Sequence, residues 1–152
     1  MLKSRIFMLG AILGIGSLLL SGCSSASPSQ PTQMPSMALA DMPDYVQSAA
    51  ASVQEAYQFA ITNPHALETV PCYCGCGKMG HKNNLDCYVT STAGNGKITF
   101  DNHAAYCGVC SDITHDVMRL QQAEITPTKI RAYIDAQYSA YGPPTDTALP
   151  VE

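Results

Sequence analysis

Apolar residues recur at steps of three and four positions in several segments, and this spacing predicts helices because such residues share one helical face. The first long helix is expected to end near Thr62, and its stripe comprises Val46, Ala49, Val53, Ala56, Tyr57 and Ala60. A later helix has the stripe Ile113, Val117 and Leu120. The last helix is expected to stop at Gly142, and its stripe comprises Ile130, Tyr133, Ile134, Tyr138 and Tyr141.

Two proline-containing pairs mark where helices begin. In Asn63-Pro64 and Thr126-Pro127, a residue with a capping side chain stands directly before a proline, which favours the first turn of a helix. The first pair predicts a short helical turn through Val70, and the second predicts the start of the last helix.

Residues 71–106, between the second and third predicted helices, show no helical period. Residues 91–96 form a turn-rich insert, and residues 97–100 are typical of a short strand that pairs with residues 87–90. A loop of this length is uncommon in a compact domain and is often functional. The predicted fold class is therefore mainly α: a small helical domain with an irregular cysteine-rich loop and a short two-stranded hairpin.

The first residues are typical of an export signal. Lys3 and Arg5 precede an uncharged apolar run over residues 6–20, which is shorter than the roughly 20 apolar residues of a membrane span but suits a signal peptide. Residues 20–23, Leu-Ser-Gly-Cys, resemble a bacterial lipobox, and the resemblance implies cleavage before Cys23 and lipidation of its sulfur. The other interpretation is a signal anchor with an incidental cysteine. Lipidation predicts attachment to the cell membrane on its extracytoplasmic side.

These features divide the chain into four expected parts. Residues 1–22 are the lipoprotein signal peptide, and residues 23–42, which are rich in Ser, Pro, Gln and Ala, form a flexible tether. Residues 43–142 form the cysteine-rich domain, and residues 143–152 form a disordered tail. The net charge of −4 and the lack of a basic patch argue against nucleic acid as a partner.

Closely spaced cysteines carry the strongest functional signal. Residues 71–76 read Pro-Cys-Tyr-Cys-Gly-Cys, and alternate side chains of an extended backbone point the same way, so these thiols can face one point. Converging thiolates are typical ligands of a soft metal ion. The candidate metal ligands are Cys72, Cys74, Cys76, Cys87, Cys107 and Cys110, with His81 and His103 completing or supporting the site.

The same spacing bears on the identity of the metal. Soft thiolates select Cu(I), zinc or iron–sulfur clusters, and export of an unfolded chain into an oxidising compartment disfavours iron–sulfur. Four-coordinate zinc sites usually contain pairs of Cys-x-x-Cys, and only residues 107–110 have that form. Cys-x-Cys repeats beside a histidine favour Cu(I), with zinc as the alternative.

Two other interpretations of the cysteines stay open. Six cysteines besides Cys23 form an even number, so disulfides could make the domain a stapled structural or interaction module. Cys107 and Cys110 could instead be the pair of a thiol–disulfide oxidoreductase, if a helix N-terminus lowers the pKa of Cys107. Unbonded sulfurs within about 4 Å of one another favour metal, whereas bonded pairs at about 2.05 Å do not.

The chain resembles the bacterial PCYCGC-motif lipoproteins. The resemblance rests on the hexapeptide at residues 71–76 and on Asn63-Pro64, Gly80-His81, Asn84-Leu85-Asp86-Cys87, His103 and Cys107-Gly108-x-Cys110. It implies a lipid anchor and a cysteine/histidine site, and it implies no particular reaction.

The sequence thus predicts a membrane-anchored metal-binding lipoprotein that binds or delivers Cu(I) or zinc, with a membrane metalloprotein as a candidate recipient. Whether the protein is an enzyme stays open, with a binding protein favoured, because the aspartates are scattered and form no visible acid–base pair: Asp86, Asp101, Asp112 and Asp116. Asp86 and Asp101 are candidates for contacts that orient the histidines.

Overall fold

The computed structural model describes residues 36–151, and within this range the protein is mainly α, as predicted. Its helices and strands are α1 (Asp44–Gln47), α2 (Ala51–Thr62), α3 (Pro64–Glu68), β1 (Val89–Thr92), β2 (Ile98–Phe100), α4 (Gly108–Gln122) and α5 (Pro127–Tyr138). Short 3₁₀ turns lie at Leu39–Asp41, Cys76–Met79, Leu85–Cys87 and His103–Tyr106. The predicted signal peptide, the lipidation site Cys23 and most of the tether lie outside the described residues.

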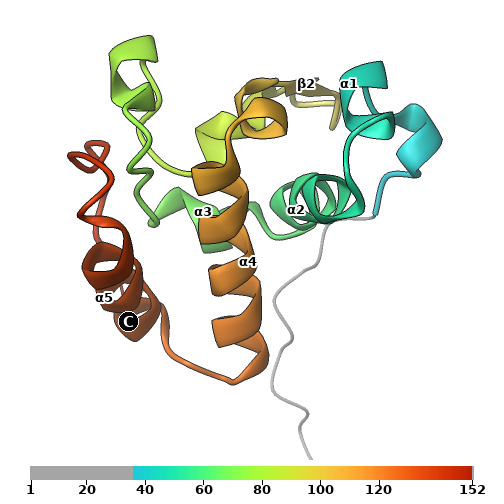
Figure 1. Ribbon diagram of the computed structural model, residues 1–152. Coiled ribbons are helices and arrows are strands. Elements are labelled where there is room, and N and C mark those ends of the chain that lie inside the picture. Colours follow the sequence, from blue (N-terminus) through green and yellow to red (C-terminus); the bar gives the residue numbers. More distant parts are fainter. Residues whose placement is uncertain (1–35, 152) are drawn as a thin grey trace, which may run out of the picture. The chain divides into compact units, whose positions relative to one another are not determined.

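Helix α4 is the centre of the helical packing and contacts both α2 and α5 (Figure 1). Buried side chains of the three helices belong to one core: Ala56, Tyr57, Ala60, Ile61, Ile113, Val117, Ile130, Ile134 and Tyr138. Each fully buried aliphatic or aromatic side chain stabilises the fold by roughly 1.5–3 kcal/mol. Tyr133 and Tyr141 of the predicted last stripe are exposed, and α5 ends before Tyr141.

The helix predicted to end near Thr62 is interrupted close to its start. Ala50 has an extended backbone, with φ −58° and ψ 149°, and this residue separates α1 from α2. The side-chain amide of Gln54 donates hydrogen bonds to the carbonyls of Gln47 (2.8 Å) and Ala49 (3.0 Å). These bonds satisfy carbonyls that a helix end leaves unpaired. The break is therefore stabilised by a side chain, which apolar periodicity does not reveal.

Both proline-containing pairs begin helices where predicted, since Pro64 opens α3 and Pro127 opens α5. The capping chemistry differs from the prediction, because neither Asn63 nor Thr126 makes a side-chain capping bond. The Asn63 amide instead donates to the Phe59 carbonyl (3.4 Å), at the C-terminal end of α2. The fixed φ of proline is what favours a helix start at these positions.

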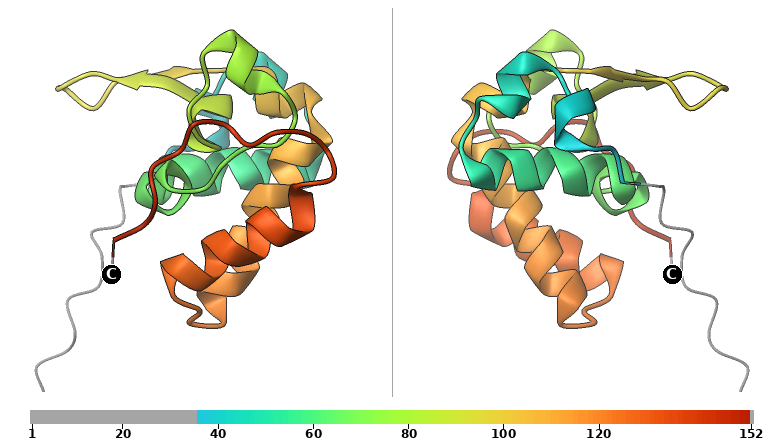
Figure 2. Two further views of the ribbon diagram at one scale, coloured as in Figure 1. Left: turned by 90° about the vertical axis from the view of Figure 1, so that its left-hand side faces the viewer. Right: turned by 90° about the vertical axis from the view of Figure 1, so that its right-hand side faces the viewer.

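The predicted hairpin forms two residues later on its first strand than expected, with Val89 opposite Phe100. It projects away from the helices, and only its base reaches the core (Figure 2). The backbone N–H of Asp101 donates to the Tyr88 carbonyl (2.8 Å) just outside the strands. This bond holds the base of the hairpin beside the cysteine-rich loop.

Single residues near both ends of the described chain are buried in the domain. Met42 is only 3 % exposed, and the side-chain amide of Gln47 donates to its carbonyl (2.6 Å). Thr145 is 5 % exposed. At these two positions the expected flexible tether and disordered tail are not found, because the residues are buried and hydrogen-bonded. None of the helices in residues 36–151 combines the length and apolar character that crossing a membrane requires.

Candidate metal centre

The PCYCGC segment turns sharply at its fifth residue. Gly75 has φ 86°, a left-handed conformation that glycine adopts readily because it lacks a Cβ atom. The three alternate cysteines are divided between two groups of ligands: Cys74 belongs to one group, whereas Cys72 and Cys76 belong to a second group beside it. The predicted convergence of thiols exists, but it is divided between two centres.

The outer group consists of Cys74, His103, Cys107 and Cys110, one ligand atom of each lying within 4.8 Å of all the others. Cys74 Sγ is 3.2 Å from His103 Nε2 and 3.7 Å from Cys110 Sγ. Two sulfurs bound to one ion at about 2.3 Å can lie at most about 4.6 Å apart, so the group has nearly the size of one ligand shell. Cys110 is buried, and the other three side chains are half-buried.

The inner group consists of Cys72, Cys76 and Cys87, whose sulfurs also lie within 4.8 Å of one another. All three side chains are at most 1 % exposed. Cys76 Sγ is 3.7 Å from Cys87 Sγ, and Cys87 Sγ is 3.4 Å from His81 Nδ1. The inner group therefore offers three buried thiols with a histidine at its edge.

All six described cysteines are free. The Sγ–Sγ contacts among five of them, all except Cys107, run from 3.3 to 3.7 Å. A disulfide has a bond of about 2.05 Å, whereas two thiolates on a tetrahedral ion at about 2.3 Å lie about 3.8 Å apart. The cysteine and histidine side chains can therefore hold a metal ion, and their geometry differs from that of three disulfides.

The two candidate histidines share one carboxylate. Their rings pack edge to face, with the centroids of His81 and His103 5.4 Å apart. Asp101 lies 3.6 Å from His81 Nε2 and accepts a hydrogen bond from the His103 backbone N–H (2.7 Å). A carboxylate at the far ring nitrogen orients the other nitrogen of a histidine, here toward Cys87. Asp86 instead accepts from a backbone N–H of its own loop (2.6 Å).

A buried polar network lies behind the outer group. Thr114 Oγ1 is 2.7 Å from both the Tyr88 hydroxyl and Asn84 Oδ1. The Tyr88 hydroxyl (3.0 Å) and the Asn84 amide (3.3 Å) both donate to the Cys110 carbonyl. All three network side chains are fully buried. Sequence reasoning missed the role of Thr114, although its place four residues after Cys110 puts the two on one helical face.

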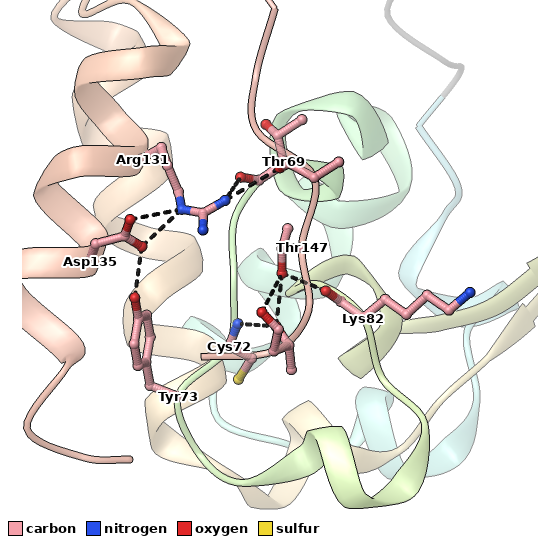
Figure 3. Close-up of polar contacts among 9 residues, drawn as sticks. Thr69, Cys72, Tyr73, Lys82, Arg131, Asp135 and Thr147 are labelled. Carbon is pink, nitrogen blue, oxygen red and sulfur yellow. Dashed lines mark hydrogen bonds and ion pairs between the residues drawn. The ribbon is translucent and has the colours of Figure 1, made fainter. Parts of the chain in front are cut away.

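The C-terminal segment, residues 143–151, crosses the PCYCGC segment (Figure 2). Thr145 Oγ1 accepts a hydrogen bond from the Cys72 N–H (2.9 Å), and the Thr145 N–H donates to the Cys72 carbonyl (3.0 Å). The Thr147 hydroxyl bonds in turn to the Lys82 carbonyl and the Thr145 hydroxyl (Figure 3). Both backbone groups of Cys72 are thereby fixed, a contact that the sequence does not reveal.

Helix α5 anchors the same region. Arg131 donates to the carbonyls of Thr69 (3.1 Å) and Ala148 (3.3 Å), and it pairs with Asp135 (2.8 Å). The Tyr73 hydroxyl donates to the same carboxylate (2.7 Å; Figure 3). One ion pair thus links α5, the PCYCGC segment and the C-terminal segment.

Thiol–thiol contacts shift the ionisation of the site. Hydrogen bonding with Cys110 is the main cause that lowers the pKa of Cys72 and of Cys74. Burial raises the pKa of Cys107. The oxidoreductase interpretation places Cys107 at a helix N-terminus, and Cys107 is indeed the N-cap residue of α4, although burial acts against ionisation of its thiol.

The remaining histidines and one groove lie away from the two groups. His65 pairs with Glu68 (2.8 Å), and His115 Nε2 is 3.0 Å from the Ser52 carbonyl. A groove of about 390 Å³ is lined by α2, α3 and the hairpin, with no cysteine in its lining. The Met79 side chain is 57 % exposed, so it is not buried with the sulfurs of either group.

A family model matches nearly the whole chain, over residues 12–150; its description is "Protein of unknown function with PCYCGC motif". The chain belongs to the PCYCGC family. The matched residues include the hexapeptide and every cysteine and histidine of the two groups. Neither the curated proteins nor the solved structures compared with the chain gave a match. Membership in the PCYCGC family confirms the resemblance seen in the sequence. Because the family description gives no function, a function has to be inferred from the chemistry of the site.

Proposed function

We propose that the protein is a membrane-anchored extracytoplasmic lipoprotein that binds Cu(I) and delivers it to a recipient. The observation that carries this proposal is the meeting of six free thiols and the His103 imidazole in two adjoining groups of metal-binding size. Thiolate and imidazole are the ligands that soft and borderline metal ions prefer. Hard ions such as Mg²⁺ and Ca²⁺ prefer oxygen ligands, which neither group contains.

The composition of the inner group supports Cu(I) over zinc. Structural zinc sites are almost always four-coordinate, whereas the inner group offers three thiols. Cu(I) is among the ions that thiolates select, and three soft ligands suffice for it. The outer group, with three thiols and one histidine, is a set that zinc also accepts, so zinc is the alternative metal.

Delivery is supported by the predicted anchor and by the partial exposure of the outer group. A lipid on Cys23, in the predicted lipobox, would hold the domain beside the membrane through the chain that precedes residue 36. A membrane metalloprotein is the recipient that this placement suggests. Three of the four outer ligands are only half-buried, so an accepting ligand can approach an ion there.

Metal competition tests this function. The full chain, extracted in detergent without oxygen, is loaded with Cu(I) or Zn²⁺ and titrated with a chromophoric chelator for each ion. We expect Cu(I) to be retained against the chelator far better than zinc, and we expect retention to be lost when Cys72, Cys74 and Cys76 are all changed to serine. His115→Ala is the matched control, because that histidine lies outside both groups. Equal retention by the triple variant and the wild type would contradict the proposal.

A further inference from the structure

Cys72 stands between the two groups. Its Sγ belongs to the inner group with Cys76 and Cys87. The same sulfur is 3.3 Å from Cys74 Sγ and 3.4 Å from Cys110 Sγ, both of the outer group. A thiolate carries several lone pairs and can bind two soft ions at once. One sulfur is therefore placed to bridge two neighbouring metal positions.

We infer that the site holds two metal ions bridged by the Cys72 thiolate, of which the outer ion is the exchangeable cargo and the inner ion is retained. The inference rests on the proposed function and deepens it by stating which ligands carry the delivered ion. It follows from the unequal burial of the two groups. All the cysteines of the inner group are buried, whereas three of the four ligands of the outer group are only half-buried.

The inner position is closed to competing ligands. Cys72 and Cys87 have no exposed surface, and Cys76 is 1 % exposed. The C-terminal segment is hydrogen-bonded to both backbone groups of Cys72 through Thr145. His81, with a side chain only 11 % exposed, covers the edge near Cys87. A chelator reaches an ion here only after local opening of the loop, so release is slow.

The outer position is open on one side. Cys74, His103 and Cys107 are half-buried, and Tyr106 beside them is 77 % exposed. An acceptor thiol can therefore bind the outer ion while the protein ligands still hold it. Each new metal–sulfur bond replaces one bond to the outer group, and the freed thiolate takes up the proton that the acceptor thiol loses. The oxidation state of the metal does not change.

Metal counting combined with release kinetics tests the inference on the full chain. The chain is loaded anaerobically with Cu(I), freed of excess metal, and mixed with a water-soluble Cu(I) chelator. We expect two ions per chain, one lost at least tenfold faster than the other. One ion per chain, or two ions lost in a single phase, would overturn the inference while leaving the proposed function intact. Chains that bind no ion would instead overturn the proposed function.

Two substitutions test which group of ligands holds the ion that is released in each kinetic phase. Cys107→Ser is expected to remove the fast phase and leave the slow ion in place, because this cysteine belongs to the outer group alone. Cys76→Ser is expected to remove the slow phase. His115→Ala, remote from both groups, should keep both phases unchanged. If Cys107→Ser instead lost the slowly released ion and kept the rapidly released one, the assignment of the fast phase to the outer group would be overturned.

A measurement on the unaltered chain tests the bridge even if the Cys76 variant does not fold. X-ray absorption at the copper edge of the fully loaded protein should show scattering from a second metal close to the first. The same signal should disappear once the chelator has taken the fast ion, because only one metal remains. A loaded protein with two ions and no metal–metal scattering would overturn the bridging role of Cys72.

Discussion

Thr114 supports the candidate metal centre from inside the core. Its hydroxyl bonds to both Asn84 and Tyr88, and these two side chains donate to the Cys110 carbonyl. A buried polar group that loses its partner costs about 1–3 kcal/mol. The hydroxyl should therefore contribute more to stability than its small size suggests.

We predict that Thr114→Val lowers the free energy of unfolding by about 1–3 kcal/mol, because the volume is nearly kept while two buried partners lose a bond. Urea denaturation of the metal-free chain measures the change. Thr90→Val, at an exposed position of β1, is the matched control and should leave the free energy nearly unchanged. Equal stabilities of the two variants would contradict the role of the network.

Asp101 is expected to act through the histidines. It lies 3.6 Å from His81 Nε2 and accepts from the His103 backbone N–H. Residues that orient metal ligands contribute about 10–100-fold to affinity, so Asp101→Asn should weaken Cu(I) binding by that factor. Chelator competition measures the affinity, and Asp112→Asn, at an exposed position of α4, is the control. An unchanged affinity would show that the aspartate has no such role.

Single residues could be predicted where their spacing in the sequence indicates a kind of site. Cys72 and Cys110 could be chosen as candidate ligands because clustered thiols suit few purposes other than metal, disulfides or redox chemistry. Asp86 and Asp101 were both chosen as contacts of the histidines; Asp101 lies beside His81, whereas Asp86 bonds to its own loop. Thr114 was not chosen, since its partners lie 26 and 30 positions away in the chain.

At the scale of elements, the apolar stripes predicted the helices and the end of α2 at Thr62, but they predicted neither the break before α2 nor the end of α5 at Tyr138. The stripe of α4 is correct because Ile113 and Val117 are fully buried. The break between α1 and α2 depends on the Gln54 amide, and a glutamine has no periodic signal. The PCYCGC segment is not extended throughout, because Gly75 has a left-handed backbone that the expected alternation did not include.

The C-terminal segment gives an element-scale prediction. Thr145→Val removes the acceptor for the buried Cys72 N–H, and we expect a loss of about 1–3 kcal/mol in the free energy of unfolding. The release of the slow metal ion should accelerate as well, because the inner group loses part of its cover. Asp146→Ala, at the exposed neighbouring position, is the control for both measurements. A variant that unfolds and releases metal like the wild type would contradict this support.

At the scale of the whole molecule, the sequence predicted the fold class and the family. The function has to be inferred from the chemistry of the ligand groups. Helical periodicity and a rare motif are local properties, so they can be recognised without a structure. The relation between the two ligand groups is not local, because it joins residues 72–76 with residues 103–110 through folding. Only the arrangement in space shows whether spaced cysteines come close enough together to bind one metal ion.

The predicted lipid anchor concerns the whole molecule and lies outside the described residues. We predict that the wild-type chain from the membrane fraction lacks residues 1–22 and carries lipid on Cys23, whereas Cys23→Ser carries no lipid, because the attachment site is removed. Mass spectrometry of the extracted chains measures this. Ser24→Ala, which leaves the cysteine in place, is the control. A wild-type chain that keeps residues 1–22 and carries no lipid would favour the signal-anchor interpretation.

Elemental analysis with a thiol count would decide whether the six described cysteines are reduced and hold metal. The full chain should be extracted from its native compartment in detergent and without oxygen. We predict stoichiometric copper or zinc, and six cysteines that react with a thiol reagent once a chelator has removed the metal. No metal and no reactive thiols would contradict metal binding and identify the domain as a disulfide-stapled module.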